Sequence, residues 1–191
     1  MKFIVAGTGP SVEGWTPPPG YTTIGVHDIG QHFTPDHLLV FDHKRKFTPE
    51  RFRIIEATDP HDTLWTRNIA ISGLGGSDWT QLKDNPKRKS FVGRSYHTVS
   101  ETIEALRTKE MILPHYRSSA YTACSLAYKL GATWIGLIGV DLTGHYTLMR
   151  HAPDVNKGFA RLREALSNLG TILVNLSKES MLTSIPYEEL S

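Results

Sequence analysis

The sequence predicts one α/β domain spanning residues 1–191, built on a doubly wound, mostly parallel sheet with helices on both faces. Three observations predict this fold class. Short apolar runs rich in β-branched residues alternate with amphipathic helical segments along the chain. The first apolar run ends in the glycine-rich turn Gly7-Thr8-Gly9-Pro10-Ser11. The run at 134–140 is apolar throughout, which is typical of a parallel strand buried on both faces.

Short apolar runs bounded by turn residues give the predicted strands. They lie at 2–6, 22–26, 38–41, 53–57, 111–113, 134–140 and 171–174. Three prolines between residues 15 and 20 exclude a full crossover helix after the first strand, because proline breaks a helix interior. The first connection is therefore expected to be short or irregular.

Helical periodicity predicts helices at 100–106, 119–130 and 159–169. Gly131 and Gly170 follow two of them, where glycine commonly ends a helix. Residues 58–95 show no clear period, and Gly73-Leu74-Gly75-Gly76-Ser77 and Asp84-Asn85-Pro86 interrupt them. We expect an irregular insertion there, a loop or hairpin that packs over one end of the sheet.

Composition narrows the class of protein. The net charge of +2 is too small to favour nucleic-acid binding. Cys124 is the single cysteine, so no internal disulfide can form, and its apolar helical surroundings predict a buried, inert thiol. No run approaches the roughly 18 apolar residues of a membrane helix. The apolar run near Met1 ends at Gly7 and is too short for a signal peptide. We expect a cytoplasmic protein.

Polar residues follow the predicted strands at the points where they end. In an open parallel sheet, ligands bind outside the carboxyl ends of the strands. Glycine allows a backbone to approach a phosphate closely, and the helix that follows directs N–H groups at an anion. The sequence therefore predicts a nucleotide site, with polar surface loops as the alternative. Its candidate residues are Gly7, Gly9, Pro10, Ser11, His27, Asp28, Asp42 and Asp141.

Arg117-Ser118-Ser119 stands where the helix at 119–130 should begin. Serine is a favoured N-cap, so simple capping is one explanation of this triplet. A second serine and an adjacent arginine exceed what a cap requires. Together with the helix dipole, they would form a phosphate-binding site.

Asp141 and His145 are the catalytic candidates. Asp141 directly follows the apolar run, and His145 lies in the loop after it, where a histidine could act as an acid or base near neutral pH. His151 cannot be separated from His145 on sequence alone. No histidines stand at zinc-site spacing, although carboxylates and a bound nucleotide could hold Mg²⁺ through phosphate oxygens. The turn lacks the third glycine of dinucleotide-binding proteins, which disfavours a nicotinamide cofactor.

Several motifs recur together in one known group of proteins. A strand is followed by G-x-G-P-S, a second strand ends in G-V-H, and a third is followed by Asp. L-G-A-x-x-I-x-L-I-G-V-D-L and N-L-S-x-x-S-x-L come later, so the motifs lie within 2–42 and 117–184. The chain resembles the Rossmann-like group of bacterial CMP-sialic-acid-dependent sialyltransferases, flagellin-modifying sugar transferases and archaeal 6-hydroxymethylpterin diphosphokinases. It is most similar to the short phage and prophage members of that group.

The resemblance implies a nucleotide held by the Gly7–Ser11 turn, by the position after the second strand and by Arg117–Ser119. It also implies polar contacts from Asp141 and its loop. The chain has His27 where the sialyltransferase pattern has an asparagine. It also has no obvious lid with a catalytic histidine, so the resemblance supplies no catalytic base.

The leading hypothesis is a nucleotide-binding glycosyltransferase that uses a nucleotide sugar as substrate. His145 would deprotonate the acceptor, and Asp141 would orient the loop. The alternatives are a Mg²⁺-dependent diphosphotransferase acting on a small molecule, and a non-catalytic module that binds a nucleotide or a host factor. No covalently bound cofactor is expected, and association into a homo-oligomer stays open.

Overall fold

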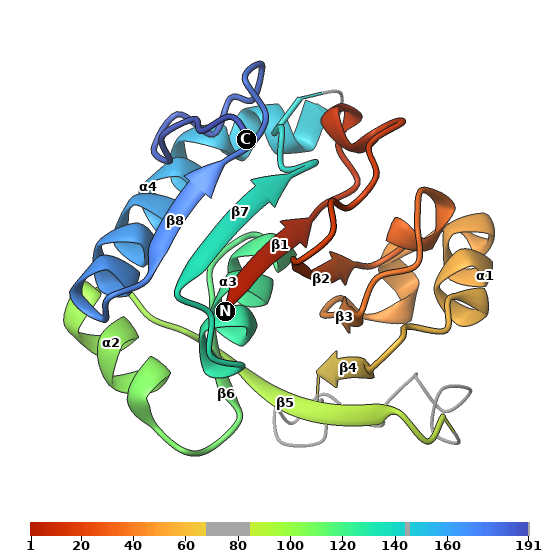
Figure 1. Ribbon diagram of the computed structural model, residues 1–191, viewed down its shortest axis with the longest axis horizontal. Coiled ribbons are helices and arrows are strands. Elements are labelled where there is room, and N and C mark those ends of the chain that lie inside the picture. The colour runs from red at the N-terminus through yellow and green to blue at the C-terminus, as the bar shows by residue number, and fades with distance from the viewer. Residues whose placement is uncertain (68–84, 144–145, 191) are drawn as a thin grey trace.

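A computed structural model describes residues 1–67, 85–143 and 146–190. Within these residues, eight parallel strands form one sheet in the order β6-β5-β4-β3-β2-β1-β7-β8, which confirms the predicted fold class (Figure 1). The strands are β1 Lys2–Ala6, β2 Thr22–Val26, β3 His37–Val40, β4 Thr63–Arg67, β5 Arg88–Ser95, β6 Ile112–His115, β7 Trp134–Ile138 and β8 Ile172–Asn175. The helices are α1 Pro49–Ala57, α2 Val99–Arg107, α3 Ser119–Lys129 and α4 Tyr146–Asn168. Short 3₁₀ helices are η1 Pro10–Val12, η2 Ile29–Gln31 and η3 Lys44–Lys46.

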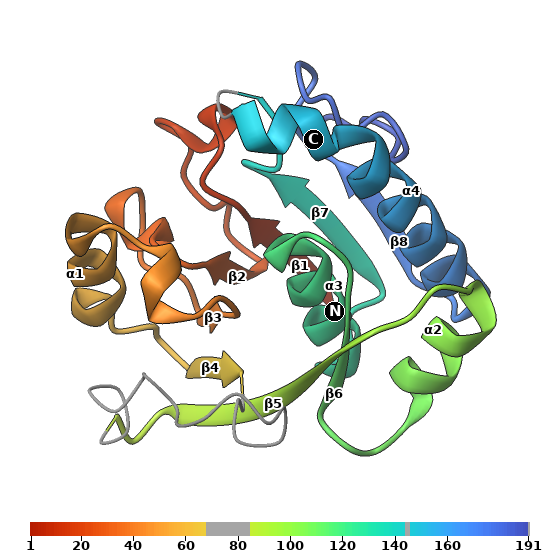
Figure 2. The same ribbon diagram turned by 180° about the vertical axis from the view of Figure 1, so that it is seen from behind.

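Helices cover both faces of this sheet. Successive residues of a strand point to opposite faces, so Phe3 of β1 packs into the core under α3 and α4, which Figure 2 shows in front of the sheet. Ile4, the next residue, packs into a second core with Phe52 and Ile55 of α1. The strand order extends from β1 to β6 on one side and to β8 on the other. The order therefore reverses between β1 and β7, where sheets of this kind bind ligands.

The predicted strand at 53–57 is wrong, because these residues belong to helix α1. Thr48 caps the helix by accepting a hydrogen bond from the Arg51 N–H at 3.4 Å, and Pro49 occupies the first turn. Phe52 and Ile55 are buried three residues apart, which is a helical spacing. The cap and proline before this apolar run outweigh its β-branched residues.

The irregular insertion expected at 58–95 contains two regular strands. β4 and β5 pair in parallel with their neighbours and extend the sheet beyond β3. The first half of β5 pairs with β4, and its second half, from Val92 onward, pairs with β6. The part of the insertion at 68–84 lies outside the described residues. The basic run before Ser90 concealed β5, although Phe91 is buried.

The C-terminal part of the chain covers one edge of the sheet. Helix α4 begins at Tyr146, well before the predicted 159, and Pro153 lies inside it. After β8, the chain returns to Asn175, whose N–H donates to the Pro186 carbonyl at 2.8 Å. Cys124 is fully buried as predicted, and burial raises the pKa of its thiol. None of the described helices is long and apolar enough to cross a membrane.

Candidate functional site

The glycine-rich turn after β1 packs directly against the turn after β7. The Gly7 N–H donates to the Ile138 carbonyl and the Gly9 N–H to the Gly139 carbonyl, both at 2.8 Å. A Cβ at Gly7 would collide with the Gly139 carbonyl oxygen, and one at Gly9 would lie 2.6 Å from Asp141 Oδ2. Close backbone approach therefore accounts for both glycines. Phosphate binding by this turn stays a prediction.

Asp141 joins the turns that follow three strands. Its side chain is buried, and Oδ2 accepts a hydrogen bond from the Ser11 N–H at 2.8 Å, while Oδ1 accepts one from the Ser177 hydroxyl at 2.7 Å. The Ser11 hydroxyl oxygen in turn accepts from the Gly139 N–H at 2.9 Å. Both carboxylate oxygens thus accept hydrogen bonds from donors within the protein. This arrangement suits a positioning residue, and the predicted catalytic role of Asp141 stays a prediction.

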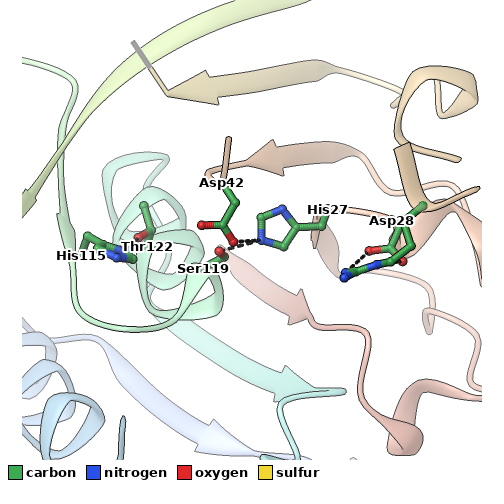
Figure 3. A network of polar contacts seen from close by, with 7 residues as sticks. His27, Asp28, Asp42, His115, Ser119 and Thr122 are labelled. Carbon is green, nitrogen blue, oxygen red and sulfur yellow. Dashed lines mark hydrogen bonds and ion pairs between the residues drawn. The ribbon is translucent and has the colours of Figure 1, made fainter. Parts of the chain in front are cut away.

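A second polar cluster joins the ends of β2 and β3 to the start of α3 (Figure 3). Nε2 of His27 lies 2.7 Å from the Ser119 Oγ and 3.4 Å from Asp42 Oδ2. His27 is 8% exposed, and its Nδ1 is buried without a hydrogen-bond partner in the described part of the chain. Three segments that are far apart in the sequence therefore meet at this point, and each carries a predicted site residue.

Backbone strain concentrates along this edge. His27, Arg117 and Leu142 have φ values of 54°, 51° and 57°, and they are the non-glycine residues with positive φ among the described ranges. Such conformations cost of order 1–3 kcal/mol each and persist only where the surrounding structure enforces them. One follows β2, one precedes α3 and one lies just after β7. Each helps to shape the carboxyl edge of the sheet.

Two titratable groups in and beside the second cluster have shifted pKa values, Asp42 and His115. Burial is the largest single influence and raises the pKa of Asp42, but the hydrogen bond to His27 and the neighbouring basic groups His27, His115 and Lys46 together lower it more, so the net shift is downward. Asp42 is therefore ionised at neutral pH. Burial lowers the pKa of His115, at the end of β6, to about 4, so its ring is neutral there. Nδ1 of His115 contacts the Thr122 Oγ1 at 2.9 Å, and Figure 3 shows Asp42 and Ser119 between His115 and His27.

Asp28 is engaged by an arginine of α1. The Nε and a terminal nitrogen of Arg51 donate to its two carboxylate oxygens at 2.9 and 2.6 Å. The Asp28 side chain is 4% exposed, and hydrogen bonding to it raises the pKa of Arg51. This bidentate pair ties the end of β2 to α1. Whether Asp28 also contacts a ligand stays a prediction.

The serines at the start of α3 do not cap it through their side chains. Ser118 occupies the N-cap position without a side-chain hydrogen bond, and the Ser119 hydroxyl is paired with His27. Arg117 Nε lies 3.4 Å from Asp154 Oδ2 on α4, and both side chains are about half exposed. The first N–H groups of α3 thus point to the carboxyl edge of the sheet, and they donate no hydrogen bond to a serine side chain.

The remaining predictions fall elsewhere. Pro10 opens η1, the 3₁₀ helix after the glycine turn. His145 lies outside the described residues, and His151 is half-buried on α4. Among the described residues, no group of three or more His, Cys, Asp or Glu side chains is placed to hold a metal ion. Sequence reasoning missed His115, because it ended the strand at residue 113. Extending that strand by two residues would have placed a histidine at its carboxyl end.

Comparison with known proteins relates the fold to sialyltransferases. No family model and no curated protein sequence matches the chain. Among solved structures, it is similar to the sialyltransferase CstII from Campylobacter jejuni in complex with the substrate analogue CMP-3FNeuAc, with a TM-score of 0.58 and 15% identity over 97% of this chain and 84% of that one. A structure of a mutant described as α-2,3/8-sialyltransferase CstII also has a TM-score of 0.58 at 15% identity, over 98% and 86%. For a CstII complex with cytidine-5′-monophosphate, the TM-score is 0.55 and the sequence identity is 13%, over 97% of this chain and 83% of that one. At such identity the likeness concerns the fold, which is sialyltransferase-like.

Proposed function

We propose that the protein is a nucleotide-sugar-dependent glycosyltransferase of the sialyltransferase type. One observation carries the proposal: the His27–Ser119 contact of 2.7 Å brings the end of β2 against the start of α3. Ligands of open parallel sheets bind at this carboxyl edge, near the point where the strand order reverses. The likeness to CstII supports the same assignment, because two of those structures hold CMP or a CMP-sugar analogue.

The start of α3 is suited to the phosphate of the nucleotide. Its first N–H groups carry the positive end of the helix dipole, and neither Ser118 nor Ser119 accepts a hydrogen bond from them. Arg117 stands next to this helix start with a half-exposed side chain. In glycosyl transfer, the bond between the sugar carbon and the phosphate oxygen breaks, and negative charge grows on the departing phosphate. Fixed N–H donors at that position stabilise this charge.

Asp42 and His27 are suited to the hydroxyl or amino groups of the nucleoside. Asp42 is ionised, and its carboxylate accepts hydrogen bonds. The unpartnered Nδ1 of His27 has no hydrogen bond to lose when a ligand binds. Buried polar atoms without a partner are uncommon in proteins and often mark a functional position. The base that activates the acceptor is left to His145 or His151, as the sequence predicts.

Isothermal titration with CMP, CDP, UDP, GDP and ATP, each with and without Mg²⁺, tests the proposal. We expect CMP or another pyrimidine nucleotide to bind at micromolar concentration, and Ser119→Ala to weaken it about fivefold or more. Ser167→Ala, an exposed serine near the end of α4, is the matched control and should leave binding unchanged. If no nucleotide binds below about millimolar, the proposal fails.

A transfer assay separates catalysis from binding alone. The chain is incubated with CMP-N-acetylneuraminic acid, and the release of CMP is followed by chromatography with and without sugar acceptors. Acceptor-dependent release that Ser119→Ala reduces would support a transferase. Tight CMP binding without any release would favour the non-catalytic binding module instead. Nucleotide binding that requires Mg²⁺ would favour the diphosphotransferase.

A further inference from the structure

We propose that Arg67, the last residue of β4, forms with Phe41 a subsite for a carboxylate or phosphate group beside the proposed nucleotide site. Its assignment to the acceptor of glycosyl transfer rests on the proposed function, whereas the anion subsite itself does not. No predicted site residue belongs to it.

Aromatic packing fixes the position of the guanidinium. The Cζ atom of Arg67 lies 4.8 Å from the centroid of the Phe41 ring. His115 stacks on the same phenyl ring with centroids 3.8 Å apart and an interplanar angle of 16°, and Phe91 packs at 6.0 Å. A Cβ at Gly93 would lie 2.6 Å from the edge of the Phe41 ring, so glycine there makes room for the stack. An aromatic ring held on several sides orients the planar guanidinium that rests on it.

The charge of Arg67 has no protein partner in the described residues. Arg51 and Arg117 are each paired with an aspartate. The backbone of Arg67 pairs with β5, but its side chain makes neither an ion pair nor a hydrogen bond with the described residues, and it contacts the Phe41 ring. Its side chain is half-buried, so its donors have lost part of their water. His115 is neutral at pH 7 because burial lowers its pKa. The positive charge of the stack therefore belongs to Arg67, whose five N–H donors match a carboxylate or phosphate.

The subsite adjoins the cluster proposed to bind the nucleotide. Phe41 directly precedes Asp42, whose carboxylate contacts His27. His115, which stacks on Phe41, lies within electrostatic range of both Asp42 and Arg67. An anion held by Arg67 would therefore lie near the Asp42 carboxylate, and because like charges repel, the neutral part of the same molecule would face Asp42. This arrangement selects a sugar or other small molecule that carries an acidic group and hydroxyls. An acidic sugar acceptor has this chemistry.

Titrations with small probes test the subsite. N-acetylneuraminic acid supplies a carboxylate, inorganic phosphate supplies a phosphate, and N-acetylmannosamine is the neutral control. They are compared on the wild-type chain, on Arg67→Met and on Arg53→Met, which removes the same charge from an exposed position of α1. We expect Arg67→Met to weaken an acidic probe about tenfold or more. Arg53→Met should change it less than twofold. The proposal would be overturned if both variants bound every anionic probe, CMP included, with equal affinity, or if the wild-type chain bound the neutral sugar as tightly as the acidic one.

Two further arms identify the source of the anion and guard against misfolding. A loss of CMP affinity in Arg67→Met, with N-acetylneuraminic acid unaffected, would assign the subsite to the nucleotide phosphate, and the reverse pattern would assign it to the acceptor. Arg67→Lys keeps the charge without the planar fork, so its affinity for the acidic probe should fall between wild type and Arg67→Met. If wild type binds the acidic probe but no nucleotide, the proposed function fails while the subsite stands.

Discussion

Substitutions of Asp141 should lower the free energy of unfolding, and the loss should be larger the more of its two hydrogen bonds a substitution removes. Asp141→Ala removes the acceptor of both the Ser11 N–H and the Ser177 hydroxyl in a buried position. Hydrogen bonds to charged groups are worth about 1.5–3 kcal/mol each, and the Ser11 N–H would stay buried without a partner. We expect a loss of about 3–4 kcal/mol in the free energy of unfolding. In Asp141→Asn, the amide oxygen can accept from Ser11 and the amide nitrogen can donate to a reoriented Ser177 hydroxyl, so the loss should be about 1–2 kcal/mol.

Urea denaturation followed by circular dichroism gives the free energies. Ser177→Ala removes one of the two hydrogen bonds and should cost about 1–2 kcal/mol. Asp59→Ala is the matched control: its carboxylate pairs with Lys87 on the surface and is 72% exposed, so its loss should be below about 1 kcal/mol. The reasoning is refuted if Asp141→Ala unfolds within 1 kcal/mol of wild type, or if Asn at that position costs as much as Ala.

Three further predictions concern other parts of the same edge. Gly9→Ala should cost about 2 kcal/mol or more in thermal unfolding, because its Cβ would lie 2.6 Å from the Asp141 carboxylate; unchanged melting would contradict this close approach. The lowered pKa of His115, about 4 instead of 6.5, means that the unfolded chain takes up a proton first, so stability should fall by about 3 kcal/mol between pH 7 and 4. His115→Gln should flatten that pH profile in urea titrations, and an equally steep profile would exclude His115 as its source. Arg51→Met should lower the free energy of unfolding in urea more than Asp28→Ala does. It leaves the Asp28 carboxylate, which is 4% exposed, without its partner, whereas the Arg51 side chain left by Asp28→Ala is 41% exposed and can reach water. The opposite order would contradict a buried carboxylate.

The sequence predicted those elements whose local signals agree with their packing. β1 and β2 were placed to the residue, because each is a short apolar run that ends at a glycine or polar turn. Helix α3 was placed within one residue by its apolar period and by Gly131, whose φ of 93° a glycine adopts readily. The alternation of strands and helices was enough to give the parallel sheet.

The errors have two causes: tertiary contacts that no local pattern shows, and local helix signals that were given less weight than strand-like composition. β5 carries an exposed lysine and serine before Phe91, and it is a strand because β4 and β6 bond to its two halves. The segment at 53–57 has strand-like composition, yet Thr48 and Pro49 start a helix ahead of it. The helix predicted at 159–169 begins earlier in the structure, because α4 starts at Tyr146 and continues through Pro153. No short window of sequence contains β5 together with both of its partner strands. Thr48 and Pro49, in contrast, lie close enough to 53–57 to indicate the helix from the sequence.

For the candidate site, strand ends indicated the edge but not the pairings. The rule that polar residues gather at carboxyl ends placed His27 and Asp42 on one edge, and the structure adds that Nε2 of His27 lies between Asp42 and Ser119. The sequence rule could not show that both carboxylate oxygens of Asp141 accept hydrogen bonds from Ser11 and Ser177, because these residues are far apart in the sequence.

Nuclear magnetic resonance can locate bound CMP on the protein residue by residue. A hollow of about 280 Å³, lined in part by Met111 and Ile112 at the start of β6, offers an alternative binding place away from the carboxyl edge. If CMP binds at the carboxyl edge, the largest amide shift changes on its addition should fall at His27 and at residues 117–120, and Ser119→Ala should reduce them. Shift changes confined to the β6 hollow, or none at millimolar CMP, would contradict binding at the carboxyl edge.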